Sequence, residues 1–269
     1  MKEEPLLLVK DLNVVFRYPG KEITAARGVS FAVGRNETLV MAGESGSGKS
    51  VTALSVCGLL PEQSAFVSGS ARFDGAELIG MPQKRLRSFR GRRIAYIFQE
   101  PASYLNPVYT IGEQIAEVIR LHRGAVRAAA WKEAEHLLEL SGISCPQRAA
   151  RSYPHQLSGG MNQRAAISMA LACRPELLIA DEPTTSLDMT TEAEIIKLLT
   201  RLKKELGFSL LFITHNLAIA ERIADQVAVM FRGELVEYRM KEELFASPEH
   251  AHTKELLAAY EKVGRFIEG

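Results

Sequence analysis

The chain has 269 residues, 46% of them hydrophobic and 24% charged, which is ordinary for a soluble globular protein and allows one large domain or two small ones. Its formal net charge of +1 gives no electrostatic case for a dedicated nucleic-acid binder, so we expect no nucleic acid among its partners. No uncharged apolar stretch approaches the roughly 20 residues that span a bilayer, so any membrane-spanning helices would have to come from another chain.

The first third of the chain predicts a series of short strands, because apolar or alternating runs are separated by turn residues. A helix is predicted from about Lys49 to Leu60, where Pro61 stops it. The predicted strands of this part are Leu6–Val9, Val14–Tyr18, Val29–Val33, Thr38–Ala42, Val67–Phe73 and Ile94–Phe98.

The middle of the chain changes character and predicts helices. Amphipathic patterns cover Ile111–Leu121 and Arg127–Leu140. A loop at Tyr153–Ser158 then leads into a helix from near Gly160 to Cys173. Residues from about 100 to 170 therefore indicate a helical insertion in an α/β core.

In the last third, strands and helices alternate, which favours a mostly parallel sheet covered on both faces. The fold class that this pattern predicts is α/β. The predicted strands are Leu177–Ala180, Leu210–Thr214, Val227–Phe231 and Glu234–Val236, and the predicted helices are Glu192–Leu206, Leu217–Ala224 and a charged stretch after Pro248.

A Gly-rich loop lies where a predicted strand passes into a predicted helix. Residues 43–50 fit the pattern G-x-x-x-x-G-K-[ST], in which glycines let the backbone wrap closely around a ligand and successive N–H groups face its phosphates. Lys49 would reach the β- and γ-phosphates of a nucleoside triphosphate, and the Ser50 hydroxyl would ligate Mg²⁺. A flexible Gly/Ser turn is the alternative, which the flanking strand and helix disfavour. The predicted nucleotide-binding segment comprises Gly43, Glu44, Ser45, Gly46, Ser47, Gly48, Lys49, Ser50 and Val51.

Two carboxylates end the apolar run Leu177–Ala180, which is costly unless something at the tip of that strand uses them. Asp181 suits a ligand of the magnesium shell, as in other phosphate-loop enzymes. Glu182 points the opposite way and suits polarising a water for in-line attack on the γ-phosphorus. An exposed acidic turn at Pro183 is the alternative, which the loop at residues 43–50 disfavours.

A second anion site is indicated at residues 157–164, where Ser158, Gly159 and Gly160 offer a hydroxyl and bare N–H groups at the start of a helix. The run Leu157-Ser158-Gly159-Gly160-Met161, followed by Gln163-Arg164, resembles the signature motif of ATP-binding cassette (ABC) ATPases. The other motifs of that family follow in the expected order over nearly the whole chain: residues 43–50, Gln99, the acidic strand end, Ser186-Leu187-Asp188 and His215.

The resemblance implies a P-loop NTPase (RecA-like) core with an N-terminal antiparallel β subdomain and an inserted α-helical signature subdomain. The core would comprise residues 1–98 and 171–269, with a short C-terminal helical extension, and the signature subdomain residues 99–170. It also implies a head-to-tail dimer that sandwiches two ATP molecules with Mg²⁺, in which the signature of one subunit covers the nucleotide on the phosphate loop of the other.

The resemblance also assigns roles to single residues. Gln99 would contact Mg²⁺ or water and link the core to the helical insertion, and His215 would touch the γ-phosphate. Asp188 would lie at the dimer interface. Tyr18 is expected to stack on adenine, with Phe16 as the competing candidate. The catalytic set implied is Glu182, His215, Lys49 and Gln99, and the metal set is Ser50, Gln99 and Asp181.

Several stretches resemble the ATPases of peptide, nickel and opine importers, among them Ile97-Phe98-Gln99-Glu100-Pro101, Tyr153-Pro154-His155-Gln156 and Phe245-Ala246-Ser247-Pro248. This implies uptake of oligopeptides or dipeptides, with nickel or a metal chelate left open as cargo. The implied partners are polytopic permease subunits, a second ATPase subunit of the same or a related kind, and indirectly an extracytoplasmic solute-binding protein. The chain would lie peripherally on the cytoplasmic face of a bacterial membrane, with Tyr104 and its neighbours receiving the permease. A soluble ABC-type ATPase of a non-transport complex is the alternative.

Overall fold

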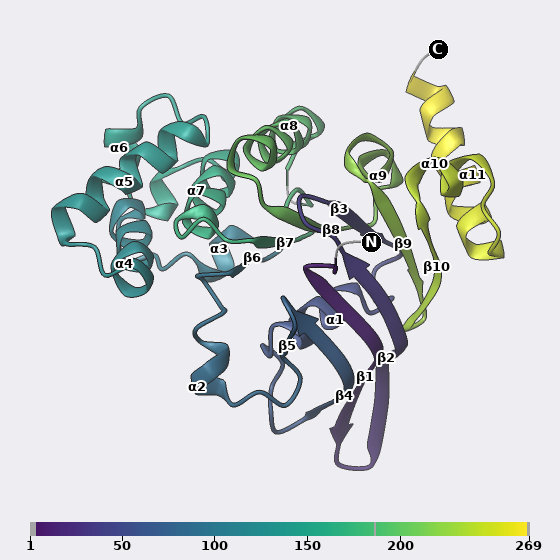
Figure 1. Ribbon diagram of the computed structural model, residues 1–269. Coiled ribbons are helices and arrows are strands. Elements are labelled where there is room, and N and C mark those ends of the chain that lie inside the picture. The colour runs from purple at the N-terminus through teal and green to yellow at the C-terminus, as the bar shows by residue number, and fades with distance from the viewer. Residues whose placement is uncertain (1–3, 186, 268–269) are drawn as a thin grey trace. The chain divides into compact units, whose positions relative to one another are not determined.

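The computed structural model describes residues 4–185 and 187–267 (Figure 1). Within them, the residues up to Leu86 and those from Ser209 onward form one compact unit, and Arg87–Phe208 form another. Over the same residues, none of the helices combines the length and the apolar character needed to cross a bilayer.

The first unit begins with an antiparallel sheet in the strand order β2-β1-β4-β5. The runs Leu6–Val9 and Val14–Tyr18 are predicted as separate strands, but from Leu7 onward both belong to one long strand. The chain stays extended between them because the pairing shifts register around Asp11, whose φ is +48°, as in a β-bulge. The strands of this sheet are β1 (Leu7–Tyr18), β2 (Lys21–Val33), β4 (Ala65–Phe73) and β5 (Ala76–Glu77).

The same unit contains four further strands, in which β3 lies between β8 and β9 and runs parallel to both. All five residues of β3 are buried, as expected for an apolar strand in the middle of a parallel sheet. Strand β10 pairs with β9 in the antiparallel direction. These strands are β3 (Thr38–Ala42), β8 (Ser209–Thr214), β9 (Gln226–Phe231) and β10 (Glu234–Met240).

The helices of the first unit include α1, which is predicted to reach Leu60 but ends at Val56, where a turn with Gly58 at φ +60° follows. The C-terminal helices α10 and α11, yellow in Figure 1, follow β10. These helices are α1 (Lys49–Val56), α2 (Gln83–Leu86), α9 (Leu217–Ile223), α10 (Lys241–Ala246) and α11 (Ala251–Ile267).

The second unit has two parallel strands, β6 (Ile94–Ile97) and β7 (Leu177–Asp181), and a group of helices. Helix α4 begins at a capping box, in which Thr110 accepts from the backbone of Glu113 and Glu113 accepts from the backbone of Thr110. The helices are α3 (Pro101–Tyr104), α4 (Ile111–Arg123), α5 (Arg127–Leu140), α6 (Pro146–Ala150), the 3₁₀ turn η1 (Pro154–Gln156), α7 (Gly159–Leu171) and α8 (Met189–Leu206).

Helices α4 to α7 pack around one apolar cluster that includes Ile111, Ile115, Ile119, Leu138 and Ala165. The amphipathic patterns at residues 111–121 and 127–140 therefore point their apolar faces into a shared core. The second unit contains this cluster together with β6, β7 and α8, so it is wider than the predicted signature subdomain at residues 99–170. The subdomain boundaries stay a proposal.

Candidate functional site

The phosphate loop joins β3 to α1, as the sequence predicts, and two of its glycines are packed against backbone. A Cβ on Gly43 would lie 2.2 Å from the carbonyl oxygen of Met230, and a Cβ on Gly48 would lie 2.3 Å from that of Ala25. The φ angles of the two glycines are +148° and +101°, which side chains rarely allow. Glycine is therefore required at both positions by the close approach of β9 and β2.

The loop is curled around the side chain of Lys49. This side chain is only 3% exposed, and its Nζ donates to the carbonyl oxygens of Gly43 and Glu44, each at 2.8 Å. The hydroxyl of Ser47 is buried and has no hydrogen-bond partner within the described residues. A buried hydroxyl and an ammonium at the centre of a loop of bare backbone fit the oxygens of a phosphate chain.

The exposed part of the loop is formed by Glu44, Ser45 and Gly46. Ser50 and Val51 follow Lys49 in the first turn of α1, and both are half-buried. The Ser50 hydroxyl thus belongs to the helix turn that follows the loop, where a phosphate-loop serine is expected to reach a cation.

His215 follows β8 at the same sheet edge as the loop. Ala42 and Thr214 are register partners in the parallel pair β3–β8, so Gly43 and His215 each come one residue after paired positions. His215 is exposed, and Asn216 next to it caps α9 by accepting from the N–H of Ala218 at 3.0 Å. The structure therefore brings the predicted histidine and the loop to one edge of the sheet in the first unit.

The two candidates for adenine stacking lie on β1. Tyr18 is 50% exposed, and its ring is nearly parallel to that of Phe16, with centroids 6.5 Å apart. Phe16 pairs with Ile23 on β2, the strand that also carries Ala25 beside the loop. Both rings therefore lie on β1, which pairs with the strand beside the loop, and either ring remains a candidate for stacking on adenine.

In the second unit, Asp181 is the last residue of β7 and is 6% exposed. Its Oδ2 accepts a hydrogen bond of 2.7 Å from the hydroxyl of Tyr96 on β6. Tyr96 belongs to none of the motifs that the sequence reveals. Its only signal in the sequence is a polar-tipped aromatic ring in an otherwise apolar strand, which usually has a partner when buried.

Glu182 follows with a φ of +44°, a left-handed value that is uncommon for any residue other than glycine. It is also unexpected before Pro183, because a proline favours extended backbone in the residue before it. Its Oε2 accepts from the Thr185 hydroxyl at 2.8 Å and from the Gln99 amide at 3.4 Å. The structure therefore brings Gln99 and Glu182 together, and it adds Thr185, which has no fixed place in any motif of the sequence.

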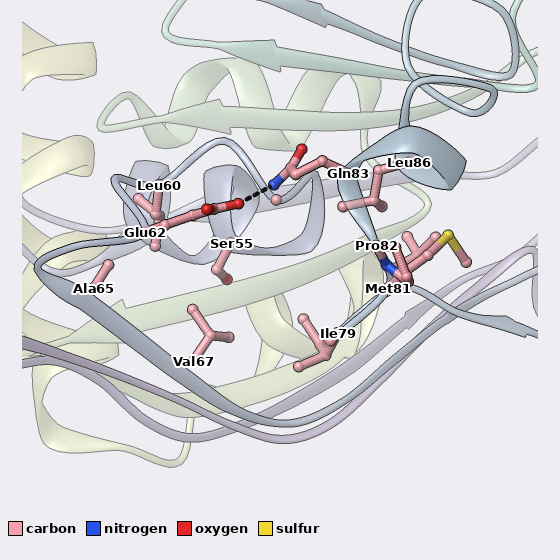
Figure 2. Close-up of a pocket in the computed structure, with 13 residues that line it drawn as sticks. Ser55, Leu60, Glu62, Ala65, Val67, Ile79, Met81, Pro82, Gln83 and Leu86 are labelled. Atoms are coloured by element: carbon pink, nitrogen blue, oxygen red, sulfur yellow. Dashed lines mark hydrogen bonds between the residues drawn. The ribbon is translucent and has the colours of Figure 1, made fainter.

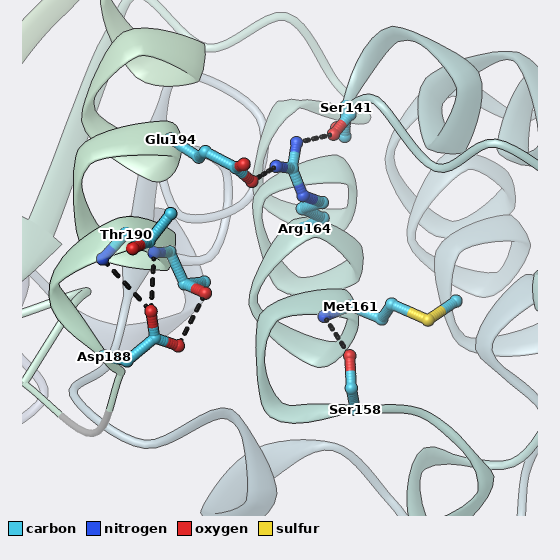
Figure 3. Close-up of polar contacts among 8 residues, drawn as sticks. Ser141, Ser158, Met161, Arg164, Asp188, Thr190 and Glu194 are labelled. Atoms are coloured by element: carbon cyan, nitrogen blue, oxygen red, sulfur yellow. Dashed lines mark hydrogen bonds and ion pairs between the residues drawn. The ribbon is translucent and has the colours of Figure 1, made fainter.

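The signature residues begin α7 (Figure 3). Ser158 is the N-cap and accepts from the N–H of Met161 at 3.3 Å. Leu157 is half-buried, while Ser158 and Gly159 are exposed at the start of the helix. Gln163 is buried, and its amide nitrogen has no hydrogen-bond partner in the described part of the chain.

Helix α7 is joined to α8 at two points. A Cβ on Gly160 would lie 2.9 Å from Cγ2 of Thr191, so the two helices approach closely there. One turn further on, Arg164 donates to Glu194 at 2.7 Å and to the carbonyl oxygen of Ser141 at 2.9 Å (Figure 3). The contact of Arg164 with the carbonyl oxygen of Ser141 cannot be inferred from the signature motif.

Asp188 is the N-cap of α8, where it accepts from the N–H groups of Thr190 and Thr191 and from the Thr191 hydroxyl (Figure 3). The hydrogen bond from the N–H of Thr191 lowers the pKa of the Asp188 carboxyl most, and the bond from the Thr191 hydroxyl lowers it further. Ser186, which precedes this turn in the motif, lies outside the described residues. Asp188, expected at the dimer interface, is therefore the N-cap of α8, and it bonds the same Thr191 that approaches Gly160.

The predicted site residues thus fall into two sets. The loop, His215 and Tyr18 belong to the first unit, and Gln99, Asp181, Glu182, the signature and Asp188 belong to the second. In the described residues, histidine, cysteine and carboxylate side chains form no cluster of three or more that could hold a metal ion. A cation here would fit one or two protein ligands together with oxygens of a bound phosphate chain, as Mg²⁺ prefers.

A cavity of about 370 Å³ lies elsewhere on the first unit (Figure 2). None of the loop residues 43–51 lines it. Its wall includes the hydrogen bond from Gln83 to Glu62 and the apolar side chains of Leu60, Val67 and Ile79. This cavity is separate from the candidate nucleotide site.

Comparison with known proteins agrees with the motifs. The profile of the ABC transporter family matches residues 26–185. The peptidoglycan transport ATP-binding protein YejF of Agrobacterium fabrum is 48% identical over 266 residues, covering 97% of this chain but only 49% of YejF, so the chain spans about half of that relative. The oligopeptide transport ATP-binding protein OppD of Bacillus subtilis is 46% identical over 255 residues, covering 94% of this chain and 71% of OppD.

A solved structure shows the same fold. The dimeric ATP-binding cassette MJ0796, in a post-hydrolysis state bound to ADP and Pi, has a TM-score of 0.77 and 27% sequence identity and covers 87% of this chain and 98% of its own. The family resemblance and the fold class predicted from the sequence are both confirmed. The chain therefore belongs to the ABC transporter family.

Proposed function

We propose that this chain is the ATP-hydrolysing subunit of an ABC importer and that it powers uptake of oligopeptides or dipeptides through separate membrane permease subunits. The observation that carries the nucleotide part is the loop wrapped around Lys49, in which Gly43 and Gly48 admit no Cβ. The relatives named for oligopeptide and peptidoglycan transport support a peptide-like cargo. Nickel or a metal chelate remains the alternative cargo.

In this proposal the backbone of residues 43–50 and the ammonium of Lys49 bind the phosphates of ATP. The hydroxyl of Ser47, which is buried without a partner in the described residues, would donate a further hydrogen bond to these phosphates. Ser50, Gln99 and Asp181 would hold Mg²⁺, which supplies charge neutralisation of the phosphate oxygens when it is bound. Tyr18, or Phe16 beside it, stacks on the adenine.

Glu182 is proposed as the general base that takes a proton from the attacking water. Hydrogen bonds from Thr185 and Gln99 to Oε2 hold the carboxylate of Glu182. The left-handed backbone of Glu182 ends the extended course of β7. Strained backbone of this kind costs on the order of 1–3 kcal/mol and often occurs at functional sites. His215 is proposed to sense the γ-phosphate from the edge of the sheet in the first unit.

The signature is proposed to act on the nucleotide of a second copy or of a related subunit. Ser158 of the partner subunit would donate to the γ-phosphate bound at Lys49, so each ATP would be enclosed by two chains. The dimeric state of MJ0796 supports this arrangement for the family. ATP binding would then close the dimer, and loss of phosphate would open it.

The chain is proposed to work peripherally on the cytoplasmic face of a bacterial membrane, together with permease subunits and indirectly with an extracytoplasmic solute-binding protein. The permease would dock on Tyr104 and its neighbours. Tyr104 packs against the apolar cluster of the second unit, whereas Val108 and Tyr109 are 72% and 52% exposed. The exposed pair is therefore the better probe, since a charge at Val108 would disturb docking with little effect on folding.

The first test uses Glu182→Gln. The variant should bind MgATP and dimerise while its hydrolysis rate falls by about two orders of magnitude or more, because the amide cannot accept the proton. Binding of a fluorescent ATP analogue, size-exclusion chromatography with ATP and release of phosphate give the three readouts. Hydrolysis at the wild-type rate would refute the assignment of the base.

The second test concerns the importer. Tagged wild-type protein and tagged Val108→Asp are each expressed in the native host, and the complexes that they form are purified from solubilised membranes. Wild type should copurify with the permeases and Val108→Asp should not, although both hydrolyse ATP alone. Copurification with soluble proteins only would instead favour a non-transport complex.

A further inference from the structure

The side chain of Tyr96 links the two parallel strands of the second unit at their functional end. Its hydroxyl donates to Oδ2 of Asp181 at 2.7 Å. Tyr96 is the register partner of Ile179, and because side chains alternate along a strand, Ile179 and Asp181 lie on the same face of β7. The hydroxyl therefore reaches along that face to the strand end.

The ring of Tyr96 packs against other aromatic rings. The centroid of Phe98 lies 4.6 Å away with the planes tilted by 39°, and Phe98 in turn lies 5.4 Å from Tyr104 on α3, tilted by 56°. Such tilted pairs are favourable beyond the area they bury. This aromatic cluster (Tyr96, Phe98 and Tyr104) has members before and after Gln99 in the chain. Ring packing within the cluster therefore orients the hydroxyl of Tyr96.

Asp181 needs such a partner because it is nearly buried. A hydrogen bond from a donor of defined position restricts the rotamers and the plane of the carboxylate that accepts it. Orientation to within a fraction of an ångström decides how well a group serves a metal-bound substrate. No motif of the family that the sequence displays contains Tyr96.

We propose that Tyr96 is a positioning residue for the magnesium-dependent binding of ATP: its hydroxyl, directed by the aromatic cluster, orients the carboxylate of Asp181 toward the hydrated cation of the nucleotide. This rests on the proposed role of Asp181. If the bond only satisfied a buried carboxylate, loss of the Tyr96 hydroxyl would lower the stability of the fold, and any effect on ATP binding would be the same with and without magnesium.

The test compares Tyr96→Phe with a matched control, Tyr260→Phe. Tyr260 also donates its hydroxyl to a carboxylate, that of Glu221, at 2.6 Å, but it lies on α11 outside the proposed site. The dissociation constant of a fluorescent ATP analogue is measured for each protein in excess Mg²⁺ and again in EDTA. The Mg²⁺ concentration that gives half-maximal hydrolysis is measured in parallel.

In Tyr96→Phe the dissociation constant in Mg²⁺ should rise by roughly three- to tenfold, the effect of losing one hydrogen bond of ordinary strength, while the value in EDTA stays at that of the wild type. The half-maximal Mg²⁺ concentration should rise with it. Phe98→Leu, which loosens the ring without removing the hydroxyl, should shift both values in the same direction by less. Tyr260→Phe should match the wild type in every measurement.

Equal dissociation constants for Tyr96→Phe and wild type in Mg²⁺, or an equal loss in Mg²⁺ and EDTA, would overturn the proposal. Asp181→Asn is measured alongside and should lose affinity in Mg²⁺ more than Tyr96→Phe does. If Asp181→Asn binds normally in Mg²⁺, the role of Asp181 itself is wrong and the proposal falls with it. If Asp181→Asn loses affinity and Tyr96→Phe does not, only the positioning role of Tyr96 fails.

Discussion

Replacement of Gly48 by alanine tests whether the phosphate loop is shaped by close backbone approach. The new Cβ would lie 2.3 Å from the carbonyl oxygen of Ala25, on a residue whose φ is +101°. The left-handed backbone costs an L-residue about 1–2 kcal/mol, and forced overpacking adds about 1–3 kcal/mol. We therefore expect Gly48→Ala to lower the free energy of unfolding by about 2–5 kcal/mol.

The matched control is Gly75→Ala. Gly75 has a φ of +77° but no heavy atom within 4 Å of a Cβ built there, so the alanine meets only the backbone cost of about 1–2 kcal/mol. The difference between the two variants isolates the contact with Ala25. The comparison also distinguishes a glycine required by close packing from one required only by the backbone conformation of a turn.

The assay is urea unfolding followed by circular dichroism in the absence of nucleotide, with the m-value compared between variants. Binding of a fluorescent ATP analogue is measured separately and should be lost in Gly48→Ala, because the loop can admit the methyl group only by moving. If Gly48→Ala is no less stable than Gly75→Ala and still binds the analogue, the close packing of the loop against β2 is not what shapes it.

Two further predictions concern carboxylates. Burial alone would raise the pKa of Glu237, but hydrogen bonds from the N–H of Glu249, from Thr253 and from the N–H of His250, together with the charge of Arg239, outweigh burial and lower that pKa. A carboxylate with a lowered folded pKa stabilises the fold above its unfolded pKa of about 4.3 and loses that effect as the pH falls through the folded pKa. Glu237→Gln should therefore be less stable than wild type at pH 7 and lose less on acidification, and urea unfolding at several pH values would contradict this if both proteins lost stability equally. Thr185→Val removes the 2.8 Å bond to Glu182 and should lower kcat roughly three- to tenfold with little change in KM, whereas a change confined to KM would count against a role for Thr185 in holding the base.

The sequence predicts those parts of the molecule that depend on local pattern. Helix Arg127–Leu140 has the predicted bounds, and the loop at residues 43–50 lies between a strand and a helix as expected. The two predicted strands at Leu6–Val9 and Val14–Tyr18 are joined because the bulge at Asp11 keeps the chain in the sheet. Bulges depend on the partner strands, which a single segment does not reveal.

The chemistry of the site is predictable only in part. Motif residues such as Lys49 and Asp181 are recognisable from spacing, but the residues that hold them are not. Tyr96 and Thr185 reach their carboxylates through tertiary contacts, and neither has a fixed place in a motif. The left-handed backbone of Glu182 also contradicts the local preference set by Pro183, so tertiary structure overrides a local rule there.

The division of the site residues between two units has a genetic consequence. The phosphate loop belongs to the first unit, and the signature helix belongs to the second, where Gly160 and Arg164 fasten it to α8. In the proposed dimer, a Lys49→Ala copy would keep an intact signature, and a Ser158→Ala copy would keep an intact loop. A mixed dimer of the two would then possess one complete ATP site and one doubly defective one, so two inactive alleles expressed together should complement each other.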